Sequence, residues 1–225
     1  MIKIFNNSKL HNNVTRILKR NKFIAGEVKI IKFKVVVAGA KDVGKTSLIR
    51  RYATGKFDKS TLSTIGVDFE TKKVVVDGTE ILLNIWDFAG EKKFRELIPS
   101  YVSGASGALI LYDLTNRESL EDLYDWIKVL ASIPNSPKTK ILIEAKIDLE
   151  DQREIKREDA KKFFEKHNFQ GEIIGVSSKT GENVESVFEM LGREILKSSL
   201  KKCVNCGKFY PLELKYCQFC GQKTL

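Results

Sequence analysis

The segment that decides the fold reads Val35-Val36-Val37-Ala38-Gly39-Ala40-Lys41-Asp42-Val43-Gly44-Lys45-Thr46-Ser47. It joins an apolar run, typical of a buried strand, to a G-x-x-x-x-G-K-T motif and a helix-like stretch. Gly39 and Gly44 let the backbone turn its N–H groups toward an anion, and the following helix adds free N–H donors. Lys45 brings a positive charge to the phosphates, and the Thr46 hydroxyl can ligate Mg²⁺. The segment predicts a polyphosphate site built from Gly39, Lys41, Asp42, Val43, Gly44, Lys45, Thr46 and Ser47.

Positive charge is concentrated at the two ends of the 225-residue chain. Of the formal net charge of +10, residues 1–34 contribute +8, residues 35–196 contribute −3 and residues 197–225 contribute +5. Basic ends indicate an anionic partner such as a membrane surface or nucleic acid, or they only keep the ends solvated. No apolar run approaches the roughly 20 residues of a membrane span, and residues 1–7 do not resemble a signal peptide. We therefore expect a cytosolic protein that is at most peripheral at a membrane.

Strand-like and helix-like patterns alternate from Lys29 onward. The strand-like runs are Ile30–Ala38, Phe69–Val76, Ile81–Trp86, Ala108–Tyr112, Ile141–Glu144 and Glu172–Val176. Asp77-Gly78 predicts a hairpin turn between the second and third runs, and the later runs are typical of strands buried between helices. With right-handed crossovers, the pattern predicts an α/β fold with a three-layer, mostly parallel six-stranded sheet and one antiparallel hairpin edge.

Apolar residues on one face predict three helices. The first follows a Thr115-x-x-Glu118 capping box and presents Leu120, Leu123, Tyr124, Ile127 and Leu130. The second presents Val184, Val187, Phe188, Leu191 and Ile195. A third, short and amphipathic, is predicted within residues 1–28 from Leu10, Val14, Ile17 and Leu18.

Residues downstream of the loop complete a magnesium and phosphate site. Asp87 and Gly90 form a D-x-x-G motif at the end of a strand-like run. The Asp87 carboxylate suits an outer-shell role at Mg²⁺, and the Gly90 N–H can face a γ-phosphate without obstruction. Thr64 lies in a polar segment after the first helix and can complete the Mg²⁺ shell.

With these motifs assembled, the chain resembles the Ras superfamily of small GTPases, and most closely its Rab branch, over about residues 32–197. The similarity lies in Thr64-Ile65-Gly66-Val67-Asp68-Phe69, Ile85-Trp86-Asp87-x-Ala89-Gly90, Lys93-Phe94-Arg95 and Tyr112-Asp113-Leu114-Thr115. It implies the P-loop GTPase fold, GTP or GDP bound with Mg²⁺, and two switch segments near Thr64 and Gly90. It also implies an exchange factor, a GTPase activator and effector proteins, the effectors binding through Thr64–Phe69, Trp86, Phe94 and Tyr101.

The resemblance also assigns the base site, with one departure. The family's N-K-x-D motif reads Ala145-Lys146-Ile147-Asp148 here. Asp148 would accept the guanine N1 and N2 protons, Lys146 would lie along the base, and Phe57 would pack edge-on against it. Ser177, Ser178 and Lys179 match the loop whose backbone N–H meets guanine O6. Because Ala145 lacks the usual amide, a loss of about 1–2 kcal/mol and a reduced affinity are expected, with guanine specificity kept.

Two further departures concern hydrolysis. Glu91 stands where the family has the glutamine that orients the attacking water, and an ionised carboxylate repels the γ-phosphate. Lys41 stands where the family has a small residue, and it can crowd or mimic an incoming arginine finger. The implied catalytic residues are Glu91, Lys45, Thr64 and Gly90. Slow hydrolysis is expected, and a nucleotide-binding scaffold that scarcely hydrolyses is an alternative.

All four cysteines lie in two C-x-x-C-G motifs near the end of the chain, at Cys203, Cys206, Cys217 and Cys220. Four thiolates at this spacing can surround Zn²⁺, and the metal would supply the folding energy that so short a segment cannot gain from a core. The motif resembles zinc ribbons. Redox-active cysteine pairs and an iron centre are the alternatives.

These patterns predict three regions: a basic extension at 1–28, a Rab-like GTPase domain at 29–198 and a zinc ribbon at 201–225. The final residues contain no prenylation motif, so we expect no prenyl anchor and assign any membrane attachment to the basic ends. A nucleic-acid-associated GTPase that uses the ribbon and the basic ends ranks lower, because no aromatic-interleaved basic strand is present.

Overall fold

The computed structural model describes residues 31–58, 64, 66–76, 78–90, 98–133, 136–169, 171–212 and 214–223. Four predictions fall outside these residues: the extension at 1–28 with its amphipathic helix, the turn residue Asp77, and the roles of Glu91 and Phe94.

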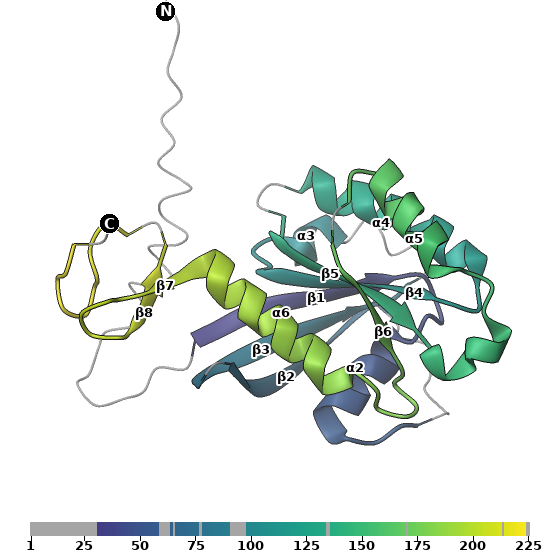
Figure 1. Ribbon diagram of the computed structural model, residues 1–225, viewed down its shortest axis with the longest axis horizontal. Coiled ribbons are helices and arrows are strands. Elements are labelled where there is room, and N and C mark those ends of the chain that lie inside the picture. The colour runs from purple at the N-terminus through teal and green to yellow at the C-terminus, as the bar shows by residue number, and fades with distance from the viewer. Residues whose placement is uncertain are drawn as a thin grey trace, which may run out of the picture. The chain divides into compact units, whose positions relative to one another are not determined.

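A six-stranded sheet occupies the centre of the described chain, in the order β2-β3-β1-β4-β5-β6 (Figure 1). Its strands are β1 (Ile31–Gly39), β2 (Val67–Val76), β3 (Thr79–Phe88), β4 (Gly107–Asp113), β5 (Thr139–Ala145) and β6 (Ile173–Val176). β2 and β3 pair antiparallel, and every other neighbouring pair is parallel. The predicted sheet with one antiparallel edge is confirmed, and no strand end differs from its predicted position by more than about two residues.

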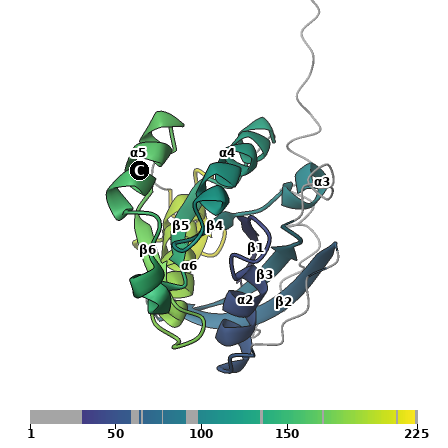
Figure 2. The ribbon, with the colours of Figure 1, turned by 90° about the vertical axis from the view of Figure 1, so that its right-hand side faces the viewer.

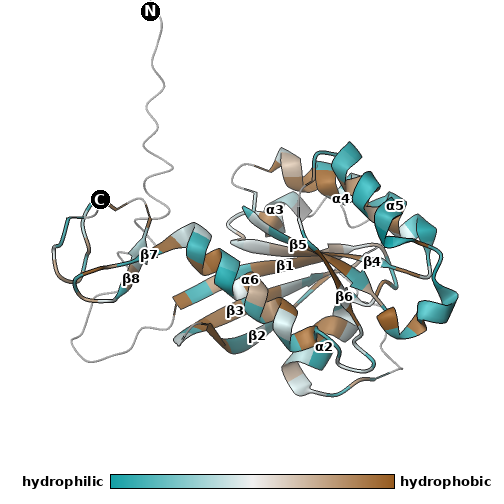
Figure 3. Ribbon diagram, in the orientation of Figure 1, coloured by the Kyte–Doolittle hydropathy of each residue, from teal (hydrophilic) through white to brown (hydrophobic). Residues whose placement is uncertain are grey.

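Helices cover both faces of the sheet, as Figures 1 and 2 show. They are α2 (Lys45–Thr54), α3 (Ile98–Val102), α4 (Arg117–Ser132), α5 (Arg157–Lys166) and α6 (Val184–Ser199), with a 3-10 segment, η2, at Ile147–Gln152. α2 and α6 pack on one face of the sheet, and α3, α4 and α5 pack on the other. Figure 3 shows the hydrophobic residues concentrated along the central strands. The three-layer prediction is confirmed.

α6 buries the apolar face that its sequence predicts. All five predicted residues are at most 3% exposed, and the Phe188 ring stacks on Tyr52 of α2 with centroids 3.8 Å apart. α4 departs from its prediction at two points. Asn116, rather than Thr115, caps the helix, because the Asn116 side chain accepts a hydrogen bond from the Glu118 N–H at 3.0 Å while the Thr115 hydroxyl donates to Asp113. Tyr124, predicted to face the core, is 38% exposed.

A small module follows α6 without a linker. It contains β7 (Leu200–Lys202) and β8 (Phe209–Pro211), which pair antiparallel. Leu200 packs against the core between α6 and the sheet, and the Leu212 N–H donates to the Ser199 carbonyl at 3.2 Å. These contacts attach the module to the end of α6. Within the part of the chain that the structure describes, no helix is long and apolar enough to cross a membrane.

Candidate functional site

The loop between β1 and α2 has the backbone that its glycines predict. Gly39, Asp42 and Gly44 have φ values of +148°, +62° and +99°. A Cβ on Gly39 would lie 2.4 Å from the Leu111 carbonyl oxygen, so this turn needs glycine for packing as well as for its backbone angle. α2 begins directly after Gly44, which leaves its first N–H groups and the positive end of its dipole facing the loop.

Lys45 is buried inside the loop and folded back along it. Its side chain donates to the carbonyl oxygens of Gly39 at 3.0 Å and Ala40 at 2.6 Å, and the residue is only 6% exposed. A buried ammonium is costly unless it is hydrogen-bonded, and here carbonyl oxygens meet that demand. The charge is therefore held at the place where an anion bound in the loop would meet it.

Three oxygen ligands predicted for Mg²⁺ converge beside Lys45. The Thr46 hydroxyl donates to Oδ2 of Asp87 at 2.5 Å, and the Thr46 and Thr64 hydroxyl oxygens lie 2.8 Å apart. The second Asp87 oxygen is buried with no hydrogen-bond partner among the described residues. Burial raises the pKa of Asp87, and hydrogen bonds from Thr46 and Thr64 together with the Lys45 charge oppose that rise. A hard divalent cation fits this set, because it takes oxygen ligands and compensates a buried carboxylate.

Gly90 closes the cavity against the phosphate loop. A Cβ at this position would lie 2.4 Å from Ala40 C and Lys41 N. Only a residue without a side chain fits so close to the loop, which agrees with the predicted approach of the Gly90 N–H to a terminal phosphate.

The predicted base residues Lys146, Asp148, Ser178 and Lys179 line the same cavity as the phosphate loop. Asp148 accepts a hydrogen bond from the Ser177 hydroxyl at 2.6 Å, and Lys179 lies 3.5 Å from its other oxygen. Lys146, with a φ of +65°, forms a 2.6 Å ion pair with Asp113. The carboxylate and both lysines are thus oriented by residues from neighbouring strand ends.

These groups line one cavity of about 370 Å³. Among the predicted residues, its lining includes Lys41, Asp42, Val43, Gly44, Lys45, Thr46, Ser47, Phe57, Thr64, Gly90, Lys146, Asp148, Ser178 and Lys179. Gly39, Asp87 and Ser177 lie behind this lining and hold residues in it, through the contacts with Lys45, Thr46 and Asp148. Glu91 lies outside the described residues.

The sequence did not predict three lining residues: Asp58, Phe88 and Leu149. It also did not predict Asp113 as the partner of Lys146. The position of Asp113 at the carboxyl end of β4 was the available signal, because side chains at that edge of a parallel sheet meet the site.

The three predicted effector aromatics that the structure describes, Phe69, Trp86 and Tyr101, form one cluster on β2, β3 and α3. The Trp86 ring centroid lies 6.1 Å from that of Phe69 and 5.9 Å from that of Tyr101. Phe69 is 61% exposed and Tyr101 37%, which is unusual for large apolar rings. Lys34 lies 4.4 Å from the Trp86 ring centroid, and burial lowers the pKa of Lys34.

The four cysteine sulfurs converge in the C-terminal module. All lie within 4.8 Å of one another, with Cys203–Cys220 and Cys206–Cys217 both at 3.6 Å. Tetrahedral Zn²⁺ with bonds near 2.3 Å requires sulfurs about 3.8 Å apart, whereas a disulfide requires about 2.0 Å. The four sulfurs are therefore spaced so that they could hold one metal ion, and they are too far apart for disulfides.

The turns of the two cysteine pairs match each other. The Gly207 N–H donates to the Cys203 carbonyl and the Gly221 N–H to the Cys217 carbonyl, both at 2.9 Å, and both glycines have positive φ. A hydrogen bond from the Asn205 side chain, followed by one from the Gln222 backbone, lowers the pKa of Cys220 to about 6. At Cys206 a backbone hydrogen bond from Lys208 acts in the same direction, but burial and hydrogen bonds with the other three cysteines outweigh it and raise the pKa to about 11. The low pKa favours the thiolate, which is the form that binds metal, at Cys220 alone of these two.

Comparison with known proteins gives a consistent family match. A family profile described as "Ras family" matches residues 34–197. The chain is 34% identical over 186 residues to "Ras-related protein Rab-13" of Canis lupus familiaris, covering 82% of this chain and 91% of that protein. It is 39% identical over 166 residues to "Ras-related protein Rab-18-B" of Danio rerio, covering 73% and 80%. It is 38% identical over 164 residues to "Ras-related protein Rab-1" of Theileria annulata, covering 72% and 74%.

Proposed function

Because the chain belongs to the Ras family and is a Rab-like small GTPase, we propose that it is a guanine-nucleotide switch that binds GTP and GDP with Mg²⁺ and hydrolyses GTP slowly. One observation carries the proposal. Phosphate-loop, magnesium-ligand and base-recognition residues line a single cavity of about 370 Å³. That volume lies in the range of small-ligand sites, which runs from about 300 to 1,000 Å³.

Each part of the cavity has a task in this proposal. Lys45, the loop N–H groups and the start of α2 bind the phosphates, and Asp148 and Ser177 orient the base. Thr46, Thr64 and Asp87 would hold Mg²⁺, directly or through water, and the bound cation neutralises charge on the transferred phosphoryl group. Thr64 and Gly90 lie in the two proposed switch segments, so a terminal phosphate would be sensed by both.

The exposed cluster of Phe69, Trp86 and Tyr101 supports effector binding next to these switch segments. We propose that effectors bind at Thr64–Phe69, at this aromatic cluster and at Phe94. An exchange factor and a GTPase activator are further proposed partners. The Rab names of the relatives favour a role in membrane trafficking, with the protein peripheral at a membrane.

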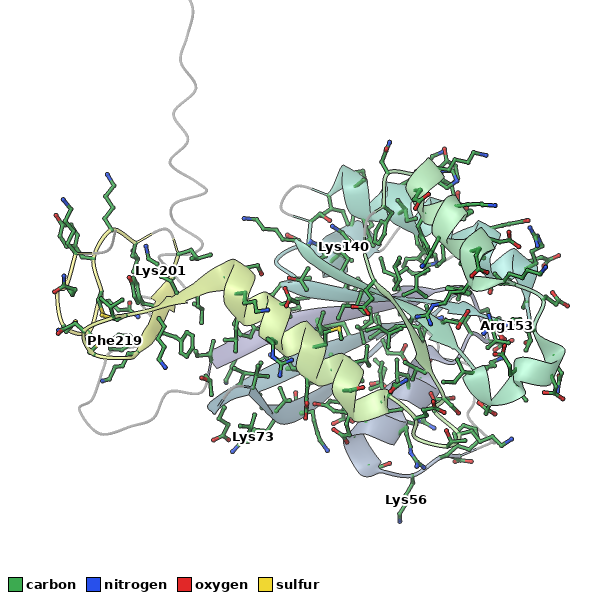
Figure 4. The ribbon with its side chains drawn as sticks, viewed as in Figure 1. Lys56, Lys73, Lys140, Arg153, Lys201 and Phe219 are labelled. Atoms are coloured by element: carbon green, nitrogen blue, oxygen red, sulfur yellow. The ribbon has the colours of Figure 1, made fainter. Side chains whose placement is uncertain are left out.

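The test of nucleotide choice is competition binding with Mg²⁺. GTP and GDP should displace a fluorescent GDP analogue, and ATP should not. Lys45→Met should abolish binding, whereas Lys56→Met should not, because Lys56 follows α2 and projects away from the cavity (Figure 4). Equal affinity of the wild type for ATP and GTP would contradict the proposal.

The scaffold alternative differs only in turnover. Single-turnover hydrolysis, measured with and without candidate activator proteins, separates the two functions. A protein that keeps GTP intact under both conditions is a scaffold.

For the C-terminal module, we assign Zn²⁺ to Cys203, Cys206, Cys217 and Cys220 on the convergence of their sulfurs. Elemental analysis of the purified full-length protein should find about one zinc per chain. Iron in place of zinc would support the iron-centre alternative. A protein that contains no metal and keeps its cysteine pairs reduced would support the redox alternative.

The basic ends are proposed to bind an anionic membrane surface. Each Lys or Arg near such a surface contributes about 1 kcal/mol, an effect that fades within a Debye length. The full chain should bind anionic vesicles in a salt-sensitive manner, and deletion of residues 1–28 should remove this binding. If the intact protein ignores such vesicles at low salt but binds RNA or DNA with a steep salt dependence, the nucleic-acid alternative replaces this proposal.

A further inference from the structure

We infer that Glu144 and Arg153 are positioning residues for guanine recognition. Their buried ion pair clamps the segment that carries Lys146 and Asp148. The inference rests on the proposed guanine-nucleotide function and is independent of hydrolysis.

Arg153 uses both edges of its guanidinium. Nη1 and Nη2 donate to the two Glu144 carboxylate oxygens at 2.6 and 3.1 Å. Nε and Nη2 donate to the two Glu150 oxygens, both at 2.7 Å, and Nη1 also donates to the Ile155 carbonyl at 2.7 Å. Such two-pronged contacts fix orientation as well as distance. The Arg153 side chain therefore connects the end of β5, the interior of η2 and the chain beyond it.

Glu144 is held from more than one side. It is 2% exposed and also accepts a hydrogen bond from the Tyr112 hydroxyl at 3.0 Å. Burial, together with the negative charge of Glu144, raises the pKa of Tyr112, so the phenol keeps the proton that it donates. A buried carboxylate with these partners is costly to disturb, because removing Arg153 would leave its charge uncompensated.

The neighbouring strand leaves room for this carboxylate. Glu144 pairs with Gly175 in the register between β5 and β6. A Cβ on Gly175 would lie 3.7 Å from Oε2 of Glu144, an ordinary contact distance, and 3.0 Å from Cγ2 of Ile147. Gly175 therefore lies next to both the ion pair and the first residue of η2.

Glu144 and Arg153 lie on either side of Lys146 and Asp148 in the sequence. Glu144 directly precedes Ala145 and Lys146, and Arg153 directly follows η2, which contains Asp148. Ala145 offers a methyl group where a longer side chain could brace the loop. The orientation of Asp148 then depends on its side-chain contacts with Ser177 and Lys179 and on the backbone that Glu144 and Arg153 hold at both ends.

A buried ion pair can also serve only the stability of the fold, and base selectivity separates the two roles. Inosine diphosphate lacks the 2-amino group of guanine, one of the two donors that Asp148 would accept. Misplacement of Asp148 should therefore weaken GDP more than inosine diphosphate, whereas general loosening should weaken both equally.

The experiment measures dissociation constants for GDP and inosine diphosphate in the full chain and in the variants Glu144→Gln, Arg153→Ala and Arg153→Lys. We expect Arg153→Ala and Glu144→Gln to lower the preference for GDP about tenfold. Arg153→Lys, which keeps the charge without the fork, should give a smaller loss. Glu194→Gln is the matched control, because it weakens an exposed 2.8 Å ion pair with Lys197.

Thermal melting shows which variants fold. If Arg153→Ala and Glu144→Gln do not fold, Arg153→Lys alone provides the test. An unchanged GDP preference in the folded variants, with or without an equal loss of both affinities, would overturn the inference. A wild type that binds GDP and inosine diphosphate equally would also overturn the inference, whereas a wild type that binds neither would contradict the proposed function.

Discussion

At the residue scale, the cavity is organised by polar contacts within the protein itself. Lys45 is held by two loop carbonyls, Lys146 by Asp113 and Asp148 by Ser177. Groups fixed in this way lose little conformational entropy when a ligand arrives. Substitutions that keep size but exchange donors for acceptors should therefore change selectivity more than folding.

Asp148→Asn is the first such substitution. The amide replaces one acceptor oxygen by a donor, so it should fit the carbonyl at position 2 of xanthine better than the amino group of guanine. GDP affinity should fall by about 1–3 kcal/mol and xanthosine diphosphate affinity should rise, both measured by competition binding. The control is Asp151→Asn, an exposed carboxylate in the same η2 segment. Unchanged preference in Asp148→Asn would remove Asp148 from the base site.

Glu91→Gln tests the residue proposed to act on the attacking water. The substitution removes a negative charge that repels the γ-phosphate, and it also removes a strong proton acceptor. Because the two effects do not cancel in general, the single-turnover rate should differ measurably from that of the wild type. Identical rates from about pH 5 to pH 8 would exclude a catalytic role for Glu91.

At the element scale, the start of α4 gives a direct test of a cap. The Asn116 side chain accepts from the Glu118 N–H, one of the helix donors without an internal partner. Asn116→Ala should lower the free energy of unfolding by about 1 kcal/mol, measured by urea denaturation. Glu121→Ala is the control, because it removes only an exposed contact 3.9 Å from Arg117. Equal stability of Asn116→Ala and the wild type would contradict this assignment of the cap.

Helices α6 and α4 together show where sequence patterns are informative and where they are not. The apolar periodicity of α6 predicted five residues of its buried face, which also includes Gly192 and Leu196, and all six strands were predicted from their apolar runs. A capping box at Thr115 fitted the sequence equally well, but the Thr115 hydroxyl donates to Asp113, two residues before it, and Asn116 caps the helix instead. The spacing of residue types does not show which side chain is already engaged elsewhere.

The site residues, too, were predictable in some segments and not in others. The phosphate loop and the D-x-x-G motif lie in continuous segments with fixed spacing, so their residues could be read in order. The pair Lys146–Asp113 depends on β4 and β5 being neighbours, and the pair Arg153–Glu144 depends on how η2 folds back on β5. The sequence contained those charges without indicating their partners.

At the scale of the whole molecule, the nucleotide cavity and the cysteine module are attached to different ends of the sheet. The cavity residues follow the carboxyl ends of the strands, after Gly39, Phe88, Ala145 and Val176. The last turns of α6 instead pack near the beginning of β4, where a Cβ on Gly107 would lie 2.7 Å from Ile195. The module continues from that end of α6. A structural change in the module is therefore not expected to reach the residues that would bind the phosphates.

Metal removal should therefore unfold the module and spare the nucleotide site. Apart from Tyr210, the buried residues of the module in the described chain are two of the cysteines, Cys203 and Cys217, so little apolar burial remains without the metal. Zn²⁺ bound to four thiolates contributes on the order of 10 kcal/mol, which the short β7–β8 pair cannot replace. A strong chelator should make the chain beyond Ser199 sensitive to protease, while GDP affinity should stay within about twofold. A variant with Cys217→Ser and Cys220→Ser should be sensitive before chelation and unchanged by it. Loss of GDP binding in step with metal loss would show that the two ends are coupled, and protease resistance without metal would show that the module folds on its own packing.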